Sequence, residues 1–234
     1  MKDLFGQALL DYQNGNYTED IITSTNISSE DTLPIPYLFR SFLDMPKLEQ
    51  KALNLAKGKV LDVGCGAGSH SLYLQEKGLI VKAIDISEGA ITVCEKRGVS
   101  NTEIKDLLNE VDTFDTILLL MNGTGIFQEL LQVSTYLNHL KSLLSPNGQI
   151  LIDSSDIKYM YEAEDGGLWI DMNTNYYGEL DYFLSYKGKK EKPLKWLYLD
   201  FNTLLTACHS TGLQCELISE GEHYDYLAKL SVKD

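Results

Sequence analysis

Hydrophobic and polar positions change their spacing several times between Lys59 and Asp153. Short apolar runs, of which Ile117–Met121 is the clearest, alternate with segments whose apolar residues recur every three or four positions. The runs are typical of strands buried on both faces, and the spaced segments are typical of amphipathic helices. This alternation predicts a parallel sheet with helices on both faces, and right-handed crossovers would make it doubly wound.

In this part of the chain we expect five strands, at residues 59–63, 79–84, 103–105, 114–121 and 149–153. The helices expected between them are 69–77, 88–97 and 128–144. After the fifth strand we expect a β-hairpin insertion with strands at 180–186 and 194–201, and then a helix at 203–210. An antiparallel pair at 213–219 and 226–232 would close the chain.

The N-terminal segment differs from the rest. Residues 1–57 lack strand alternation and indicate helices and loops, with a break at "LPIP". We therefore expect a helical cover over 1–57 and a main domain over 58–234, with the insertion at about 156–202.

The chain is acidic, with a net charge of −14 and two arginines, Arg40 and Arg97. Nucleic acids and anionic membranes bind basic surfaces, so we predict neither as a partner. The basic cluster Tyr186–Lys195 is interpreted as a solvated hairpin tip, and a small-molecule substrate, cationic or neutral, fits the charge better. The four cysteines form no CxxC pair, no apolar run would span a bilayer, and the first residues lack a signal-peptide pattern. We expect a cytoplasmic protein with reduced thiols; its oligomeric state does not follow from the sequence.

A glycine turn, "DVGCGAG", follows the first expected strand. A phosphate-binding P-loop would need a lysine after the glycines, and none is present. A dinucleotide fingerprint would need a third glycine or alanine where Ser69 stands. Asp62, two residues before Gly64, would repel a pyrophosphate but would suit a ligand with a positively charged amine or sulfonium group.

This spacing resembles motif I of the class I S-adenosylmethionine-dependent methyltransferases, which have a Rossmann-like fold. "VKAIDIS", "EIKDLL", "FDTILLLMNGTGI" and "LLSPNGQILIDSS" follow in the family's order, and the closing strand pair matches its last two strands. The resemblance implies a mostly parallel seven-stranded α/β sheet with a reversed C-terminal hairpin. It also implies S-adenosylmethionine as cofactor and S-adenosylhomocysteine as product.

The resemblance also assigns roles. Asp85 would take the ribose hydroxyls, although it could merely cap the next helix. Asp106 would take the adenine amino group, although aspartate is common in turns. Tyr37 and Arg40 could reach the cofactor carboxylate or could lie on an ordinary helix surface. The full set of implied cofactor contacts is Asp62, Gly64, Cys65, Gly66, Gly68, Asp85, Ile86, Asp106, Leu107, Met121, Arg40 and Tyr37.

The acceptor side is less defined. Asn122 could orient a substrate or form a turn with Gly123, and Asp153 could act as a base, bind an amine or cap the next segment. The Pro-Pro-aromatic sequence of enzymes that methylate DNA-base amines is absent after Asn122. Metal-dependent catechol enzymes have an acid where Asn122 stands and an Asp-Asn pair where Asp153 is followed by Ser154, so no metal is expected. The aromatic residues between Tyr159 and Tyr198 could line a substrate site or form the core of the hairpin.

These features together predict an enzyme that transfers a methyl group from S-adenosylmethionine to an acceptor, most simply a small molecule, with a protein acceptor as the second choice. A binding module that keeps the cofactor pocket without catalysis is the main alternative. An NAD(P)-dependent oxidoreductase is a more distant one, because of Ser69 and Asp62.

Overall fold

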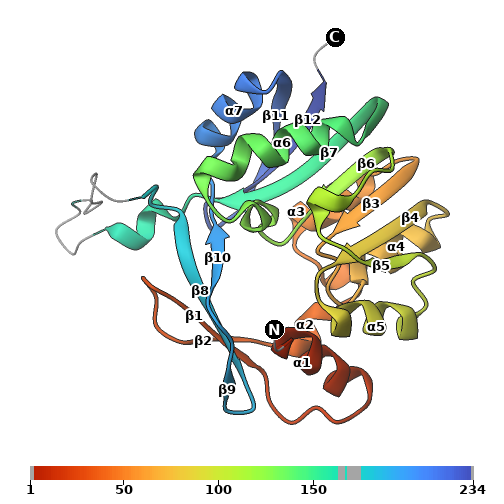
Figure 1. Ribbon diagram of the computed structural model, residues 1–234, viewed down its shortest axis with the longest axis vertical. Helices are drawn as coiled ribbons and strands as arrows, with labels where there is room; N and C mark the ends of the chain where they lie inside the picture. The colour runs from red at the N-terminus through yellow and green to blue at the C-terminus, as the bar shows by residue number, and fades with distance from the viewer. Residues whose placement is uncertain (1–2, 163–166, 168–174, 233–234) are drawn as a thin grey trace.

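The structure is a computed structural model that describes residues 3–162, 167 and 175–232. Over these residues the chain forms two sheets, a large one within the α/β part of the molecule and a smaller one beside it (Figure 1).

The larger sheet has seven strands within the described residues, in the order β11-β12-β7-β6-β3-β4-β5. They are β3 (Lys59–Val63), β4 (Ile80–Asp85), β5 (Thr102–Ile104), β6 (Phe114–Leu119), β7 (Leu144–Ser155), β11 (Leu213–Glu220) and β12 (Asp225–Val232). Neighbours from β7 to β5 are parallel, whereas β12 is antiparallel to both β7 and β11. The predicted fold class, a mostly parallel seven-stranded sheet with a reversed C-terminal hairpin, is confirmed.

Helices cover both faces of this sheet (Figure 1). They are α3 (Lys47–Leu55) and α4 (Ser69–Glu76) on one face, α6 (Val133–Ser142) and α7 (Phe201–Ser210) on the other, and α5 (Glu88–Arg97) beside β4 and β5. Val60 and Leu61 show how the strand alternates, because Val60 belongs to the core under α3 and α4 whereas Leu61 belongs to the core under α6 and α7. The carboxyl ends of the parallel strands are thereby held rigidly at one edge, where α/β proteins bind their ligands.

The smaller sheet joins two distant parts of the sequence. Its strands are β1 (Ile21–Thr25) and β2 (Asp31–Leu33) from the N-terminal segment, with β8 (Glu179–Tyr186), β9 (Lys189–Lys190) and β10 (Leu194–Leu197) from the insertion. The order is β10-β8-β1-β2, with β9 also paired to β8, and all pairs are antiparallel. The prediction that residues 1–57 contain only helices and loops is therefore wrong, because β1 and β2 complete the hairpin sheet of the insertion.

The N-terminal segment is otherwise helical, with α1 (Leu4–Gln13), α2 (Ile35–Leu38), η1 (Phe42–Asp44) and α3. Leu9 of α1, Ile35 of α2 and Leu184 of β8 share one buried cluster, which fastens α1 and α2 to the smaller sheet. The proposed domain boundary near residue 57 stays a prediction.

Several element boundaries differ from those expected. The strand predicted at 149–153 is longer and spans Leu144–Ser155, and two further differences have an identifiable cause. The helix predicted at 128–144 begins only at Val133, because Gln128 has a positive φ of 68° and the chain first forms the short helices η3 (Gly123–Phe127) and η4 (Leu130–Gln132). The strand predicted at 194–201 ends at Leu197, because the Asp200 side chain accepts a hydrogen bond from Thr203 N and starts α7 at Phe201. Over the described part of the chain, no helix is both long and apolar enough to span a bilayer.

Candidate active site

The glycine turn lies at the carboxyl end of β3, between that strand and α4. Gly64, Gly66 and Gly68 all have positive φ, of 69°, 53° and 79°, which residues with a side chain rarely adopt. The backbone amides of Gly64 and Cys65 both donate to Ile84 O, at 2.9 and 3.1 Å, and so tie the turn to β4. A Cβ on Gly68 would meet the Cys94 sulfur at 2.9 Å, whereas one on Gly66 would meet its first neighbour, in Phe5, at 3.8 Å. Gly68 therefore serves packing as well as the turn, and Gly66 leaves the backbone accessible.

Asp85 lies against this turn. One of its carboxylate oxygens accepts from Gly66 N at 3.0 Å, and the other accepts from Ser87 N at 2.9 Å. Burial raises the pKa of Asp85, and the two backbone donors oppose that shift. Ser87, not Asp85, caps α5, because its hydroxyl accepts from Ala90 N. Each oxygen of Asp85 keeps a lone pair for a further donor.

Asp62 is almost fully buried and accepts a hydrogen bond of 2.6 Å from the Ser71 hydroxyl of α4. It thus links the end of β3 to the helix that follows the turn. Cys65 is also buried, with its sulfur 3.6 Å from that of Cys94.

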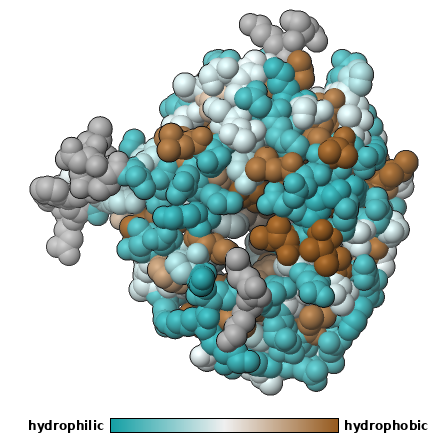
Figure 2. Space-filling view, viewed as in Figure 1, coloured by the Kyte–Doolittle hydropathy of each residue, from teal (hydrophilic) through white to brown (hydrophobic). Residues whose placement is uncertain are grey.

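Three further predicted contacts lie along the same edge of the sheet. Ile86, after Asp85, is 71% exposed. The Asp106 carboxylate accepts from Leu108 N and caps the short helix η2 (Leu107–Asn109), and its contact with a ligand stays a prediction. Leu107 is buried in the core. In Figure 2, hydrophobic residues gather beside a recess near the middle of the face of the molecule that is in view.

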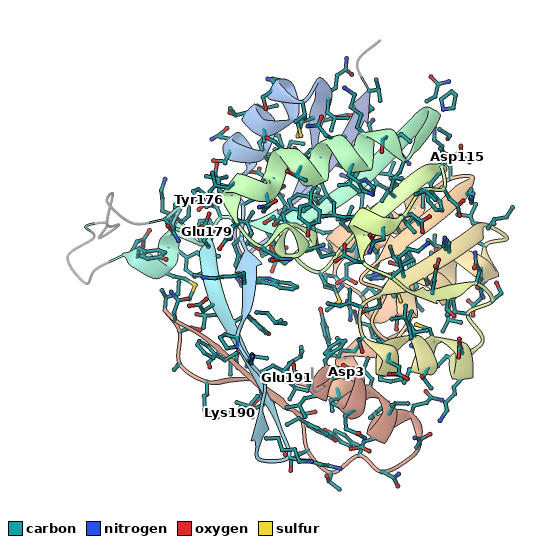
Figure 3. All side chains as sticks on the ribbon, in the orientation of Figure 1. Asp3, Asp115, Tyr176, Glu179, Lys190 and Glu191 are labelled. Atoms are coloured by element: carbon teal, nitrogen blue, oxygen red, sulfur yellow. The ribbon has the colours of Figure 1, made fainter. Side chains whose placement is uncertain are left out.

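Helix α1 lies over the glycine turn and is fixed there by Asp3. The Asp3 carboxylate accepts from the Ser87 hydroxyl and from Gly89 N at 2.9 Å, and it also caps α1 at Gly6 N. A Cβ on Gly89 would meet the Gly6 backbone at 2.5 Å, so α1 and α5 touch through two glycines. Figure 3 shows Glu191 of the insertion beside Asp3, and Glu191 accepts from Leu4 N at the start of α1.

A buried cluster of charges lies next to the first turn of α4. Arg40 donates to Glu49 of α3 and to Tyr37 O, and Glu49 also pairs with His70 Nε2 at 2.8 Å. Burial alone would lower the pKa of His70 and raise that of Glu49, but their mutual contact reverses both shifts. Arg40 Nε is buried with no hydrogen-bond partner among the described residues. Its guanidinium lies 3.9 Å from the centroid of the Tyr37 ring, which is 38% exposed.

Asp153, at the end of β7, holds the loop that follows β6. Its carboxylate accepts from Met121 N at 3.0 Å and from Gly123 N at 2.8 Å. Met121 and Asn122 both have positive φ, of 65° and 61°, so these two bonds support a strained backbone. Burial raises the pKa of Asp153 to about 7, against the effect of its two donors. Met121 is 37% exposed.

Asn122 does not point into an open site. Its side-chain amide donates to Leu197 O at 3.3 Å, and its oxygen accepts from the Ser154 hydroxyl at 3.1 Å. Thr124 joins the same network through Ser154 and Leu197 O. These contacts join the loop to β10, so Asn122 has a connecting role in addition to any contact with substrate.

The aromatic residues of the insertion divide into two groups. Tyr176 and Tyr177 bond to Asp200 and Asp156 and stabilise the base of the insertion. Tyr182 and Trp196 pack together across β8 and β10 with ring centroids 5.7 Å apart, on the face of the smaller sheet that also carries Leu184. Burial raises the pKa of Tyr198 to about 12, with Tyr182 and Tyr159 as further causes. Trp169 lies outside the described residues. Some of the described aromatic residues pack within the insertion, as the hairpin-core interpretation expects, and the others remain candidates for lining a substrate site.

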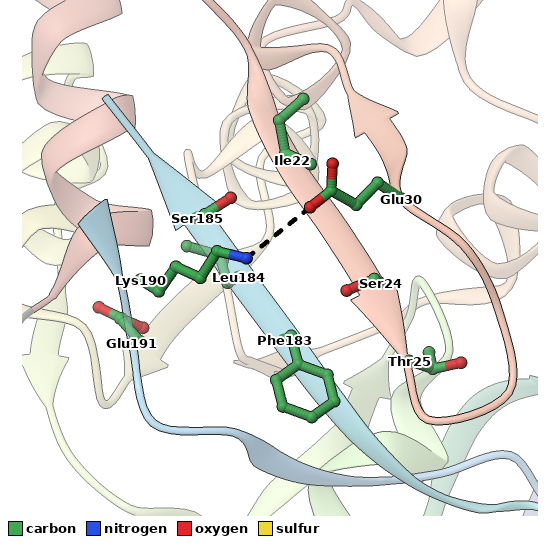
Figure 4. Close-up of a pocket in the computed structure, with 9 residues that line it drawn as sticks. All are labelled: Ile22, Ser24, Thr25, Glu30, Phe183, Leu184, Ser185, Lys190 and Glu191. Atoms are coloured by element: carbon green, nitrogen blue, oxygen red, sulfur yellow. Dashed lines mark ion pairs between the residues drawn. The ribbon is translucent and has the colours of Figure 1, made fainter. Parts of the chain in front are cut away.

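A hollow of about 240 Å³ lies on the opposite face of the smaller sheet (Figure 4). Ser24, Phe183 and Ser185 line it, and an exposed ion pair of 3.8 Å joins Lys190 to Glu30 across it. Because it faces away from the glycine turn and has no buried polar group, it carries no chemistry that the sequence predicted.

Comparison with known proteins agrees with this geometry. Residues 60–148 match the family model described as "Methyltransferase domain". A solved S-adenosylmethionine-dependent methyltransferase from Bacteroides fragilis, in complex with S-adenosylhomocysteine, is 43% identical with a TM-score of 0.92, and the match covers 99% of this chain and 95% of that one. The chain therefore belongs to the S-adenosylmethionine-dependent methyltransferases.

Curated relatives are more distant. The cypemycin N-terminal methyltransferase of a Streptomyces species is 30% identical over 103 residues, 42% of each chain. The ubiquinone biosynthesis O-methyltransferase of Pasteurella multocida is 30% identical over 131 residues, 48% of this chain and 52% of that protein. The chain spans about half the length of the curated relatives it matches.

Three residues of the site were not found from the sequence: Asp3, Glu49 and His70. One signal for Glu49 was available in the sequence. Arginine is scarce in this chain, and a buried arginine needs a carboxylate partner, which Glu49 could supply to Arg40. Asp3 had none, because its contacts with α5 are made 84 and 86 residues away along the chain.

Proposed function

We propose that this chain binds S-adenosylmethionine at the glycine turn and transfers its methyl group to a small-molecule acceptor. The observation that carries the proposal is Asp85 at the end of β4, whose carboxylate lies against the glycine turn and keeps a lone pair on each oxygen for the ribose hydroxyls. Arg40, buried beside the first turn of α4, would attract the carboxylate of a bound amino acid group, and its Nε, which is closed to solvent, would bond to that carboxylate only after the side chain rearranges. The residues present therefore fit the cofactor.

The other parts of the site fit the same ligand. Gly66 leaves room for a ligand against the backbone. Asp62 disfavours a pyrophosphate, and Ser69 stands where a dinucleotide fingerprint needs a glycine or alanine, which is why a dinucleotide is not proposed. When bound, the cofactor supplies a methyl group on a positively charged sulfur. The protein then has to position the acceptor and exclude water.

A small acceptor is proposed from the enclosure of the site. α1 lies over the glycine turn, and the smaller sheet closes the side next to α1. The relatives leave the acceptor atom open, because one is named for the N-terminus of cypemycin and the other as an O-methyltransferase. A protein acceptor and a non-catalytic binding module are the alternatives that the test must separate.

The test is calorimetric titration with S-adenosylhomocysteine, beside NADH. We expect binding of the former alone, weakened at least about tenfold in Arg40→Lys and in Asp85→Asn. Arg40→Lys keeps the charge beside Glu49, and Asp44→Asn, at an exposed carboxylate, is the matched control for Asp85→Asn. Preference for NADH, or unchanged affinity in both variants, would refute the proposal.

Turnover separates an enzyme from a binding module. S-adenosylhomocysteine released from S-adenosylmethionine is measured with pools of small amines, alcohols, thiols and carboxylic acids. Release that depends on one pool supports the enzyme. If the protein binds S-adenosylhomocysteine tightly, but neither the pools nor unfolded protein added as acceptor lead it to form S-adenosylhomocysteine from S-adenosylmethionine, the binding module is supported.

A further inference from the structure

The carboxylate of Asp153 has no positive partner of its own. Both oxygens accept backbone amides, and no described residue forms an ion pair with it. The side chain is nevertheless largely withdrawn from water, which raises its pKa to about 7. The two backbone hydrogen bonds offset part of the cost of burying this carboxylate, and the cation of a ligand would offset more of it.

The groups that face Asp153 do not provide that cation. Glu49 of α3 is acidic, and Tyr37 of α2 and Tyr226 of β12 are neutral, so none of the three supplies a positive charge. His70 of α4 favours the charged form of Asp153, but its nitrogen is bonded to Glu49, as is Arg40. The nearby positive charges are therefore already used within the buried cluster.

The loop held by Asp153 also contacts aromatic residues of the smaller sheet. A Cβ on Gly125 would lie 2.1 Å from the Trp196 ring, so the ring packs directly on this loop. Tyr182 contacts Trp196, and Tyr198 lies two residues further on, after the end of β10. Lys195, on the opposite face of β10 from Trp196, is paired with Asp181 at 2.9 Å and is exposed. Aromatic faces without a basic side chain of their own are suited to a cationic ligand.

We propose that the methyl acceptor is a small molecule with a protonatable amine, whose nitrogen binds the Asp153 carboxylate at the end of β7, with the aromatic residues Trp196, Tyr182 and Tyr198 beside the same loop 121–125. This inference rests on the proposed function and names its substrate class. Asp153 is then a catalytic residue, because it touches the reacting nitrogen.

The reaction balances as follows. The ammonium form of the acceptor gives one proton to the Asp153 carboxylate, and the freed lone pair on nitrogen forms the bond to the methyl carbon. The carbon–sulfur bond breaks with its electron pair on sulfur, which becomes neutral. The product is the N-methylated ammonium, and Asp153 returns its proton to water.

The experiment is calorimetry on the full chain saturated with S-adenosylhomocysteine. The probes are two matched pairs, cyclohexylamine with cyclohexanol and glucosamine with glucose. In at least one pair we expect the amine to bind about tenfold more tightly than the alcohol, with no such preference in Asp153→Asn. Asp44→Asn is the control, and the affinity of Asp153→Asn for S-adenosylhomocysteine should remain within about twofold of wild type.

A second readout needs no variant. An alkylammonium such as cyclohexylamine keeps its charge to about pH 10, as lysine does, so loss of binding on acidification reports the carboxylate. Amine affinity should fall about tenfold from one pH unit above the Asp153 pKa to one unit below it. If Asp153→Asn does not fold, Asp153→Glu replaces it and should keep the preference for the amine.

The outcomes separate the two proposals. If S-adenosylhomocysteine does not bind, the proposed function fails. If it binds, but neither amine exceeds its alcohol, or the preference survives in Asp153→Asn, or affinity is independent of pH, the amine acceptor is refuted while the cofactor site stands.

Discussion

A buried cluster of alternating charge consists of Arg40, Glu49 and His70. Arg40 follows α2, Glu49 lies in α3 and His70 lies in α4. Such a cluster is rarely a net source of stability, because desolvation offsets much of the attraction. Its retention next to the glycine turn is explained if it holds Arg40 in position for a ligand carboxylate.

Glu49→Gln tests the electrostatics of this cluster. We expect the variant to lose about 3–5 kcal/mol of the free energy of unfolding, because Arg40 and His70 stay buried without their counter-charge. The pKa of His70 is raised in the folded protein, so its share of the stability is full below about pH 6.5 and is lost as the pH rises through the folded value. The difference between wild type and variant should therefore narrow above that pH.

Urea unfolding over a pH series measures this difference, with Glu88→Gln, an exposed acid on α5, as control. A difference that stays constant with pH would mean that His70 is neutral in the native protein.

At the residue level the sequence predicted which positions lie along the ligand edge but not how they are connected. Asp62, Asp85 and the glycines follow a local spacing, so their location could be predicted. The pairing of Glu49 with His70 depends on how α3 packs against α4, which no local pattern encodes. Asp153 was recognised as a candidate, but its isolation from positive charge follows only from the three-dimensional arrangement.

Among the elements, α1 has the greatest influence on the site. It is fixed at Asp3 by Ser87 and Gly89, at its first residue by Glu191, and at Asp11 by Tyr186 and Lys187. Because α1 covers the glycine turn, we expect a ligand bound there to leave the site more slowly while these contacts are closed.

Gly89→Ala tests this role of α1. The added methyl group would lie within 2.5 Å of the Gly6 backbone, which cannot move aside as a flexible side chain would, so α1 must shift. We expect S-adenosylhomocysteine to dissociate faster, by about tenfold or more, and protease to cut the segment between α1 and β1 more readily. Stopped-flow displacement and limited proteolysis measure both effects. Glu88→Ala, one position earlier on α5, should change neither; equal dissociation in the two variants would contradict the role given to α1.

Strong local patterns predicted β3 and α5 to the residue, whereas β1 was missed. The residues of β1, "IITST", are mostly half-buried and show no clear alternation. Its strand state depends on pairing with β8, and a segment whose partner lies so far away carries little local signal. α6 was predicted too long because the strained loop before it is held by Asp153 and β10 rather than by its own sequence.

For the molecule as a whole, the net charge of −14 bears on the acceptor. A strongly negative protein attracts cations. Salt shortens the distance over which this attraction acts, to about 8 Å at physiological ionic strength. We expect added sodium chloride to weaken binding of cyclohexylamine severalfold and to leave cyclohexanol unchanged, as measured by the same calorimetry. A salt effect of equal size on both compounds would mean that the net charge plays no part in recognition.

The pairing of β1 with β8 also affects how the protein is made. Ile22 pairs with Ser185, so most of the parallel sheet leaves the ribosome before β1, which already has β2 beside it, can pair with β8. Contacts between residues so distant in sequence form slowly, whereas β3, β4 and their helices are close neighbours along the chain. During synthesis, therefore, the parallel core and α1 are able to fold together before the insertion has been translated, and the β1–β2 pair waits for β8.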